Sequence, residues 1–157
     1  MALQTSGQVR VDVDRTTAFD FVGDPVRLGQ CIPGCTALRE LSPGVYSALL
    51  TNEVGFITLR FKVTVEVVKV EPHSAIEAKI TGETIGLVGR VVANAGLQLS
   101  EGGPSQTDIR YTATISLTGK LGGLGEPVFR AKSASVAREF AAKLKAAIEK
   151  TPTNASV

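Results

Sequence analysis

Several features of a nucleic-acid-binding or catalytic chain are scarce in this sequence of 157 residues. It has no tryptophan, one histidine and two cysteines, and aromatic residues make up 5% of it. A nucleic-acid interface combines a dense basic stripe with interleaved aromatic side chains, and a formal net charge of +2 does not supply one. We therefore expect no nucleic-acid partner.

Long hydrophobic runs are also missing. No stretch approaches the ~20 apolar residues that a transmembrane helix needs. The N-terminus has no basic region followed by an apolar run, so we expect no secretory signal and a cytoplasmic chain. A content of 43% hydrophobic and 20% charged residues is typical of a globular protein. We assign residues 1–150 to one domain and expect residues 151–157 to form a disordered tail.

The scarce reactive side chains give little support to catalysis or metal binding. Cys31 and Cys35 flank Ile-Pro-Gly and have no second cysteine or histidine pair, so we predict no zinc site. We expect both to be reduced thiols, with Cys35 buried or half-buried. His73 stands in a Glu-Pro-His-Ser turn, and no Gly-x-Ser-x-Gly nucleophile motif is present.

The first third of the chain predicts a strand followed by two short helices. Residues 9–13 alternate Val-Arg-Val-Asp-Val, the period of a strand with one buried face. Asp14 is a suitable cap for a helix over residues 15–22, and Asp24-Pro25 opens a second helix that ends before Ile32. Residues 36–118 then contain six strands separated by short turns, which favours antiparallel pairing.

Alternate positions predict which side chains face the buried side of the sheet. The clearest row is made of large apolar residues, whereas later rows include alanines, which leave space instead of filling it. The register of the strand at 45–51 stays open, because Val45 with Leu49 and Tyr46 with Leu50 are both apolar pairs. The inward rows are Ile57, Leu59, Phe61, Val63, Val65 and Val67; Val91, Ala93, Ala95, Leu97 and Leu99; and Ile109, Tyr111, Ala113, Ile115 and Leu117.

The C-terminal segment changes to a helical period. Apolar residues recur at about four-residue intervals, and Pro127 stands near the start, where a missing amide is tolerated. A sheet with one polar face must bury its other face, and this helix is the element large enough to cover it. We predict an α+β helix-grip fold, a curved seven-stranded antiparallel sheet wrapped around a long C-terminal helix. The apolar stripe comprises Leu124, Val128, Val136, Phe140, Leu144 and Ile148.

Two segments carry a resemblance to a known family. Residues 31–35, Cys-Ile-Pro-Gly-Cys, are similar to a Leu-Pro-Gly-Cys segment of the CoxG family of carbon monoxide dehydrogenase subunits. Residues 111–125 resemble that family's tyrosine-bearing strand, which runs into Gly-Lys-Leu-Ala-x-Leu-Gly. The position of Phe140 in the last helix is also similar. The resemblance covers roughly residues 3–150.

The resemblance implies a START-like fold of the SRPBCC superfamily with a hydrophobic cavity that binds a lipid or a quinone, and no covalent cofactor. It also implies an accessory chain without catalytic machinery. Its partner would be a molybdenum hydroxylase of the carbon monoxide or xanthine dehydrogenase type. The chain would aid recruitment of that enzyme to the inner face of the membrane or to its electron acceptor, with a peripheral membrane contact.

Together the pattern and the resemblance predict a site. We expect Pro33, Gly34 and Cys35 to form a turn at the cavity mouth, and Gly119, Gly122 and Gly125 to form a hinge or gate before the long helix. A phosphate loop is rejected because Lys120 follows the first glycine and no Gly-Lys-Ser/Thr is present. Anion binding at the start of the helix stays open. The predicted cavity residues are Leu28, Ile32, Leu59, Phe61, Val91, Ala93, Ala95, Tyr111, Ala113, Leu124, Val128 and Phe140.

Two alternatives remain at this point. One is an enzyme of the cyclase or hydrolase type that acts on a hydrophobic substrate in the same cavity. It would need an inward-facing polar pair, for which Tyr111 with Thr107, or Glu83 with Arg90, are the candidates. The other is an assembly scaffold with an incidental cavity. The basic residues of the last helix are interpreted as a solvated face balanced by glutamates.

Overall fold

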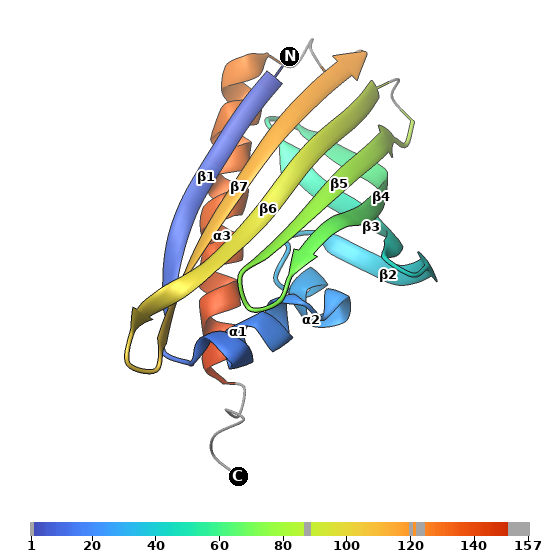
Figure 1. Cartoon of the computed structure of the whole chain (residues 1–157). Helices are drawn as coiled ribbons and strands as arrows, with labels where there is room; N and C mark the ends of the chain where they lie inside the picture. Colours follow the sequence, from blue (N-terminus) through green and yellow to red (C-terminus); the bar gives the residue numbers. More distant parts are fainter. Residues whose placement is uncertain (1, 87–88, 120, 122–124, 151–157) are drawn as a thin grey trace.

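Seven antiparallel strands form one curved sheet that wraps around the long C-terminal helix, which confirms the predicted α+β helix-grip architecture (Figure 1). The computed structural model describes residues 2–86, 89–119, 121 and 125–150. The strand order across the sheet is β1-β7-β6-β5-β4-β3-β2. The elements are β1 Ala2–Val11, α1 Arg15–Val22, α2 Pro25–Gly29, β2 Cys35–Ser42, β3 Val45–Val54, β4 Ile57–Glu71, β5 Ala75–Thr84, β6 Gly89–Gly103, β7 Gln106–Gly119 and α3 Glu126–Glu149.

The two short helices follow β1 as predicted, and capping side chains define their starts. Asp14 accepts a hydrogen bond from the backbone N–H of Thr17 at 3.2 Å and so caps α1. Asp24 caps α2 by accepting from the N–H of Val26 at 3.0 Å. Both helices lie across one end of the sheet, beside the C-terminal end of α3 (Figure 1).

β1 differs from its prediction, because it begins at Ala2 and ends at Val11. Residues 2–8 include polar residues and a glycine, which have weak strand preferences on their own. They are nevertheless paired throughout with β7, from Ala2 opposite Ser116 to Val11 opposite Thr107. Long-range pairing therefore overrides local preference here.

Bulges help to curve the sheet. The pairing register shifts between Val67 and Lys69 in β4, and between Glu101 and Gly103 in β6. An extra residue on one strand bends that strand and increases its twist. Both shifts lie toward the end of the sheet that carries α1 and α2. The bent sheet can therefore close around α3.

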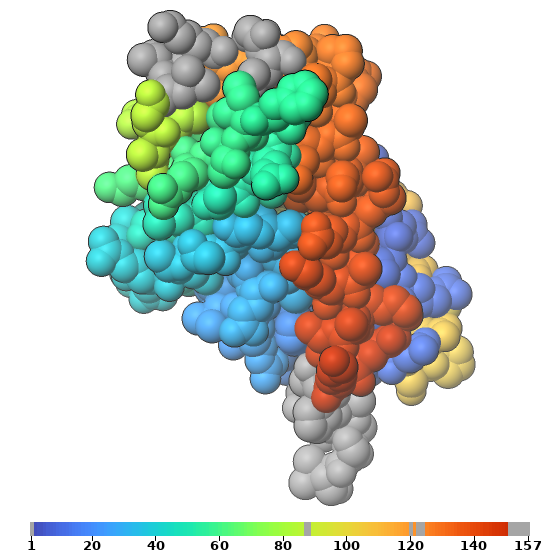
Figure 2. All heavy atoms as spheres, turned by 180° about the vertical axis from the view of Figure 1, so that it is seen from behind, coloured from blue at the N-terminus to red at the C-terminus, as the bar shows by residue number. Residues whose placement is uncertain are grey.

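α3 lies along the edge strand β1, and its first turn reaches the β3–β4 turn on the other side (Figures 1 and 2). A Cβ built on Gly55 of that turn would lie 3.6 Å from Val128 Cγ1. Within the part of α3 that the structure describes, Phe129 is 6% exposed, whereas Val128 is 37% exposed. The prediction that Val128 faces inward is therefore wrong. Val128 is eight residues from Val136, about 80° off two full turns, whereas Phe129 is seven residues away and nearly in line with it.

Buried apolar residues form two separate clusters at opposite ends of the interior. The α1-side core packs the ends of β1, β6 and β7 against α1 and the last turns of α3. The α3-start core lies where α3 begins. The α1-side core comprises Val11, Val13, Ala18, Phe21, Val22, Cys31, Leu97, Leu99, Ile109, Leu144 and Ile148, and the α3-start core comprises Leu3, Val54, Leu59, Leu117, Leu121 and Phe129.

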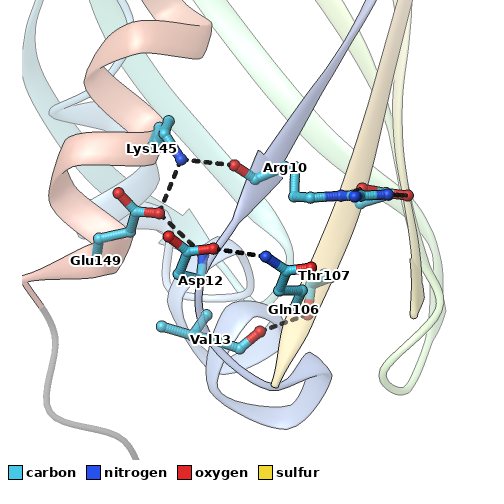
Figure 3. Close-up of polar contacts among 8 residues, drawn as sticks. Arg10, Asp12, Val13, Gln106, Thr107, Lys145 and Glu149 are labelled. Carbon is cyan, nitrogen blue, oxygen red and sulfur yellow. Dashed lines mark hydrogen bonds and ion pairs between the residues drawn. The ribbon is translucent and has the colours of Figure 1, made fainter. Parts of the chain in front are cut away.

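Polar contacts fasten the last turns of α3 to β1 (Figure 3). Lys145 Nζ donates to the backbone oxygen of Arg10 at 2.8 Å and pairs with Glu149 at 2.8 Å. Glu149 Oε2 in turn accepts from the backbone N–H of Asp12 at 2.9 Å. The C-terminal end of α3 is thus held by backbone hydrogen bonds as well as by buried leucine and isoleucine.

Candidate ligand-binding interior

The inner face of the sheet is defined by the strand registers. Ala48 pairs with the buried Val63, and Leu50 pairs with Phe61, so Tyr46, Ala48 and Leu50 face inward from β3. This register selects one of the two arrangements that the sequence left open. Cys35 pairs with Leu50 and therefore shares the same inner face at the sheet edge.

Small side chains form a continuous row across four strands of the inner face. Ala78 of β5 pairs with Ala95 of β6, Ala95 pairs with Ala113 of β7, and Ala113 pairs with Thr5 of β1. We call these four residues the alanine row. Two of them, Ala95 and Ala113, were predicted cavity residues. The row is a strip of small side chains between two rows in which most side chains are larger.

The two rows that flank the alanine row contain three larger residues each. Ile80, Ala93, Ile115 and Leu3 pair in sequence on the side of the α3-start core. Ile76, Leu97, Tyr111 and Gly7 pair on the side of the α1-side core. The alanine row therefore lies between the two cores.

The inward-facing residues near this strip are only half-buried. Leu59 and Ala93 are 3% and 7% exposed. In contrast, the inward residues Phe61, Val91, Ala95, Tyr111, Ala113 and Phe140 retain intermediate accessibility, although apolar residues on the inner face of a sheet are normally covered. Solvent therefore reaches apolar surface between the two cores.

Tyr111 is the main aromatic residue beside the strip. A Cβ built on its cross-strand neighbour Gly7 would overlap the Tyr111 hydroxyl, so the ring lies over the glycine. The ring also meets that of Phe140 edge to face, with centroids 5.8 Å apart. Gly7 thus makes room for Tyr111, and α3 meets the sheet through this aromatic pair.

The Cys-Ile-Pro-Gly-Cys segment forms the connection from α2 into β2. Gly34 has a φ of 78°, and a Cβ there would collide with the backbone oxygen of Thr51. The carbonyl of Gly34 accepts from the Thr51 N–H at 3.0 Å. Pro33 is buried, and Leu28 and Ile32 are half-buried beside it. The segment is thus a turn that fits closely against β3.

The two thiols of this segment are free, and burial raises the pKa of each. Cys31 is 2% exposed, and its Sγ donates to the backbone oxygen of Arg27 at 3.7 Å. Cys35 is half-buried, which confirms its predicted environment. A raised pKa keeps both sulfurs protonated at neutral pH and so disfavours nucleophilic chemistry.

The model of one protein family, the carbon monoxide dehydrogenase subunit CoxG, matches residues 7–149. The chain belongs to this family. That match covers both segments on which the sequence resemblance depended. No curated protein matches the chain.

Solved structures show the same fold at low sequence identity. A conserved protein from Geobacillus kaustophilus has a TM-score of 0.84 and 22% identity, over 94% of this chain and 96% of that one. A START superfamily protein from Mycobacterium smegmatis has a TM-score of 0.72 and 14% identity, over 94% and 97%. An aromatase/cyclase from a Streptomyces species has a TM-score of 0.62 and 12% identity, over 96% and 93%. The START-like fold of this CoxG family member is thereby confirmed.

The connection from β7 into α3 is described in part. Gly119 and Gly125 have φ values of 77° and 90°, a region that favours glycine. Leu121 between them is completely buried in the α3-start core. Gly122 and Leu124 lie outside the described residues. The two described glycines permit the sharp change of direction from strand to helix.

Neither polar pair nominated for catalysis is brought together in the interior of this CoxG family member. Glu83 and Arg90 are cross-strand partners, but both are exposed. Their positions alternate with those of the inward-facing residues, so they lie on the outer face of the sheet. Thr107 is 0% exposed and donates to the backbone oxygen of Val13 at 2.9 Å (Figure 3). Tyr111 is four residues further along β7, about 13 Å away. Glu83 and Arg90 therefore lie on the surface, and Thr107 and Tyr111 do not form a pair.

Sequence reasoning missed Thr5, Ala78 and Phe129. Ala78 lies within residues 36–118, where strands were predicted, and its position two residues after Ile76 was a usable signal for an inward-facing side chain. Thr5 carried no such signal, because its strand was predicted to begin later. Phe129 was missed because the four-residue count ran from Leu124 to Val128. A separate finding concerns the membrane: among the described residues, no helix combines the length and the hydrophobicity that a membrane span requires.

Proposed function

We propose that this CoxG family member is a carrier that binds one hydrophobic molecule, a lipid or a quinone, between the sheet and α3. It acts as an accessory chain and not as a catalyst. Its partner is a molybdenum hydroxylase of the carbon monoxide or xanthine dehydrogenase type, which it helps to bring to the membrane or to its electron acceptor.

The observation that carries this proposal is the accessible apolar strip between the two cores. A solid interior would cover Ala95, Ala113 and Phe61, as it covers the residues of either core. These side chains instead retain intermediate accessibility on the inner face. An apolar molecule placed over the alanine row would remove this surface from water, at about 25 cal/mol for each Å² buried.

Membership of the family supports the choice of partner, because the family is described as a subunit of carbon monoxide dehydrogenase.

A carrier of a membrane-soluble molecule must also meet the bilayer. The fold is shared with proteins of different activities, so the fold alone does not select this function.

Two measurements test the ligand. Native mass spectrometry and solvent extraction of the purified chain should reveal a bound hydrophobic species. Decylubiquinone, added to protein stripped of that species, should bind saturably at one equivalent. The proposal fails if no species is extracted and decylubiquinone shows no saturable binding.

A substitution that fills space at the alanine row tests where the hydrophobic molecule binds. Ala95→Leu adds side-chain volume to the alanine row and should weaken decylubiquinone binding at least tenfold, with little loss of stability. In a solid core the same overpacking would cost about 1–3 kcal/mol. Ala142→Leu, at an exposed position on α3, is the matched control and should change neither property. A large loss of stability with Ala95→Leu and unchanged binding would show that the molecule binds elsewhere.

A further inference from the structure

Four large apolar side chains are exposed at the end of the molecule where α3 begins. Phe56, in the β3–β4 turn, is 108% exposed, and its neighbour Ile57 is 42% exposed. Ile85, just after β5, is 52% exposed, and Val128, in the first turn of α3, is 37% exposed. We call these residues the tip surface. Exposed apolar side chains gathered at one place mark interaction sites.

The three segments that carry the tip surface lie at the same end. The β3–β4 turn touches the start of α3, because a Cβ on Gly55 would lie 3.6 Å from Val128 Cγ1. The backbone N–H of Ile85 donates to the Arg60 oxygen of β4 at 2.8 Å, which joins the end of β5 to the same hairpin. Figure 2 shows the green turn, the yellow-green end of β5 and the orange start of α3 together at the top.

Basic side chains outnumber acidic ones beside these apolar residues. On the outer face, Glu83 pairs with Lys62 on one side and with Arg90 on the other. The described residues that flank the tip surface, together with the first two turns of α3, include five basic and three acidic residues, an excess of two basic residues. They are Arg60, Lys62, Arg90, Arg130 and Lys132, against Glu53, Glu83 and Glu126.

We propose that the tip surface docks on a lipid bilayer that contains anionic lipid, with the Phe56 ring inserted at the level of the headgroups. The apolar residues project from separate turns, and Phe56 is fully exposed. Such projecting side chains suit a deformable interface, where large apolar side chains such as phenylalanine are buried at the boundary between headgroups and acyl chains. The basic excess complements anionic headgroups. This inference deepens the proposed function, since it names the surface by which a carrier would reach the membrane.

The absence of native tryptophan gives a direct test. Phe56→Trp places a single indole on the tip surface of the full chain. Vesicles of phosphatidylcholine with about 30% phosphatidylglycerol should shift its emission to the blue, as the ring leaves water. Val68→Trp, at a position of 57% exposure toward the other end of β4, is the matched control and should show no shift. An unshifted Phe56→Trp spectrum with saturating vesicles would overturn the proposal.

Loss of binding is tested by flotation with the same vesicles. Phe56→Ser with Ile85→Ser should weaken partitioning tenfold or more, because large apolar side chains supply the binding. Leu41→Ser with Val68→Ser changes two residues that are 53% and 57% exposed away from the tips, and should leave partitioning unchanged. Arg60→Gln with Arg90→Gln should reduce the preference for phosphatidylglycerol over pure phosphatidylcholine. Equal partitioning of all variants would contradict the tip surface as the docking site.

Two further measurements separate this proposal from other outcomes. Sedimentation without vesicles detects association of two copies through the tips, and a Phe56-dependent dimer without vesicle binding would overturn bilayer docking. Decylubiquinone binding in the absence of vesicles should be unchanged in Phe56→Ser with Ile85→Ser. Vesicle binding without quinone binding would remove the proposed ligand but keep the docking surface, and the reverse result would remove only the docking surface.

Discussion

The two ends of α3 are built in different ways. At its C-terminal end, Leu144 and Ile148 are completely buried in the α1-side core, and Lys145 and Glu149 bind the backbone of Arg10 and Asp12 at the end of β1. At its N-terminal end, the neighbouring turns leave Phe56 and other large apolar residues in water. The C-terminal end of α3 is fastened to the sheet by apolar and polar contacts, whereas its N-terminal end lies beside turns that carry the exposed residues of the tip surface.

This difference assigns separate tasks to the two ends. The α1-side core supplies stability, because its residues are fully covered and its polar groups are paired. The α3-start end gives up some favourable burial and retains an interaction surface. Between them lies the alanine row, which contributes little packing of its own. Substitutions at matched positions on the two ends can test this division.

The largest expected effect is the loss of a buried leucine at the closed end. Leu144→Ala should lower the free energy of unfolding by about 3 kcal/mol, since it removes a fully buried side chain and leaves a cavity. Val128→Ala, at the other end of the same helix and 37% exposed, should cost less than about 1 kcal/mol. Urea denaturation of both variants measures the contrast, and equal losses would break the comparison.

The sequence predicted the architecture well, because the spacing of its apolar residues and the positions of its capping and turn residues were clear. The helix at 15–22, the antiparallel strands and the long last helix all followed from them, and each is confirmed. The full length of β1 could not be predicted, because residues 2–8 become a strand only by pairing with β7. The exposure of Val128 could have been predicted but was missed, because the stripe was counted in steps of four from Leu124, whereas Phe129 is nearly in line with Val136.

The second effect concerns glycines with positive φ at the two ends. Gly34→Ala should cost about 2–3 kcal/mol, because the left-handed conformation is strained and the new Cβ meets the backbone of β3. Gly86→Ala, with a φ of 89° and no atom within 4 Å of the new Cβ, should cost only about 1 kcal/mol. Thermal or urea denaturation compares them. A Gly34 variant as stable as the Gly86 variant would show that β3 can move away.

The candidate site was only partly predictable. The small residues Ala95 and Ala113 were identified from strand parity, and the family resemblance supplied the expectation of a ligand. Neither could show that Ala78 and Thr5 complete one row, because that depends on the registers of β5 and β1. The proposed pair of Glu83 and Arg90 failed for a different reason: the two residues are cross-strand partners, but they lie on the outer face of the sheet.

The third effect separates backbone contacts from a surface ion pair on α3. Lys145→Met removes hydrogen bonds to the Arg10 carbonyl and to Glu149, and should cost about 1.5 kcal/mol. Arg130→Met removes an exposed pair with Glu126 one turn away, and should cost about 0.5 kcal/mol or less. Hydrogen exchange should also show faster opening of the last turn of α3 in the Lys145 variant alone. Similar exchange in both variants would argue against a fastened C-terminal end.

The smallest effect depends on pH and on how the helices are capped. Asp14 caps α1 at the closed end, and its hydrogen bonds from Thr17 hold the pKa of the carboxyl below its usual range. The N-cap of α3 at the other end is Gly125, which offers no side chain. Asp14→Ala should therefore cost about 1 kcal/mol at neutral pH. Asp14→Asn, which keeps an acceptor, should cost less.

The sign of the pH effect follows from the direction of that shift. A lowered pKa in the folded state means that the ionised cap contributes its full stability above the unfolded value of 3.8, and loses it as the pH falls through the folded value. The difference in unfolding free energy between the native chain and Asp14→Ala should therefore shrink on acidification toward about pH 3. Urea denaturation across this range measures it. A difference that stayed constant would mean that the Asp14 carboxylate does not stabilise α1 as a charged cap, and would weaken the contrast between the two ends.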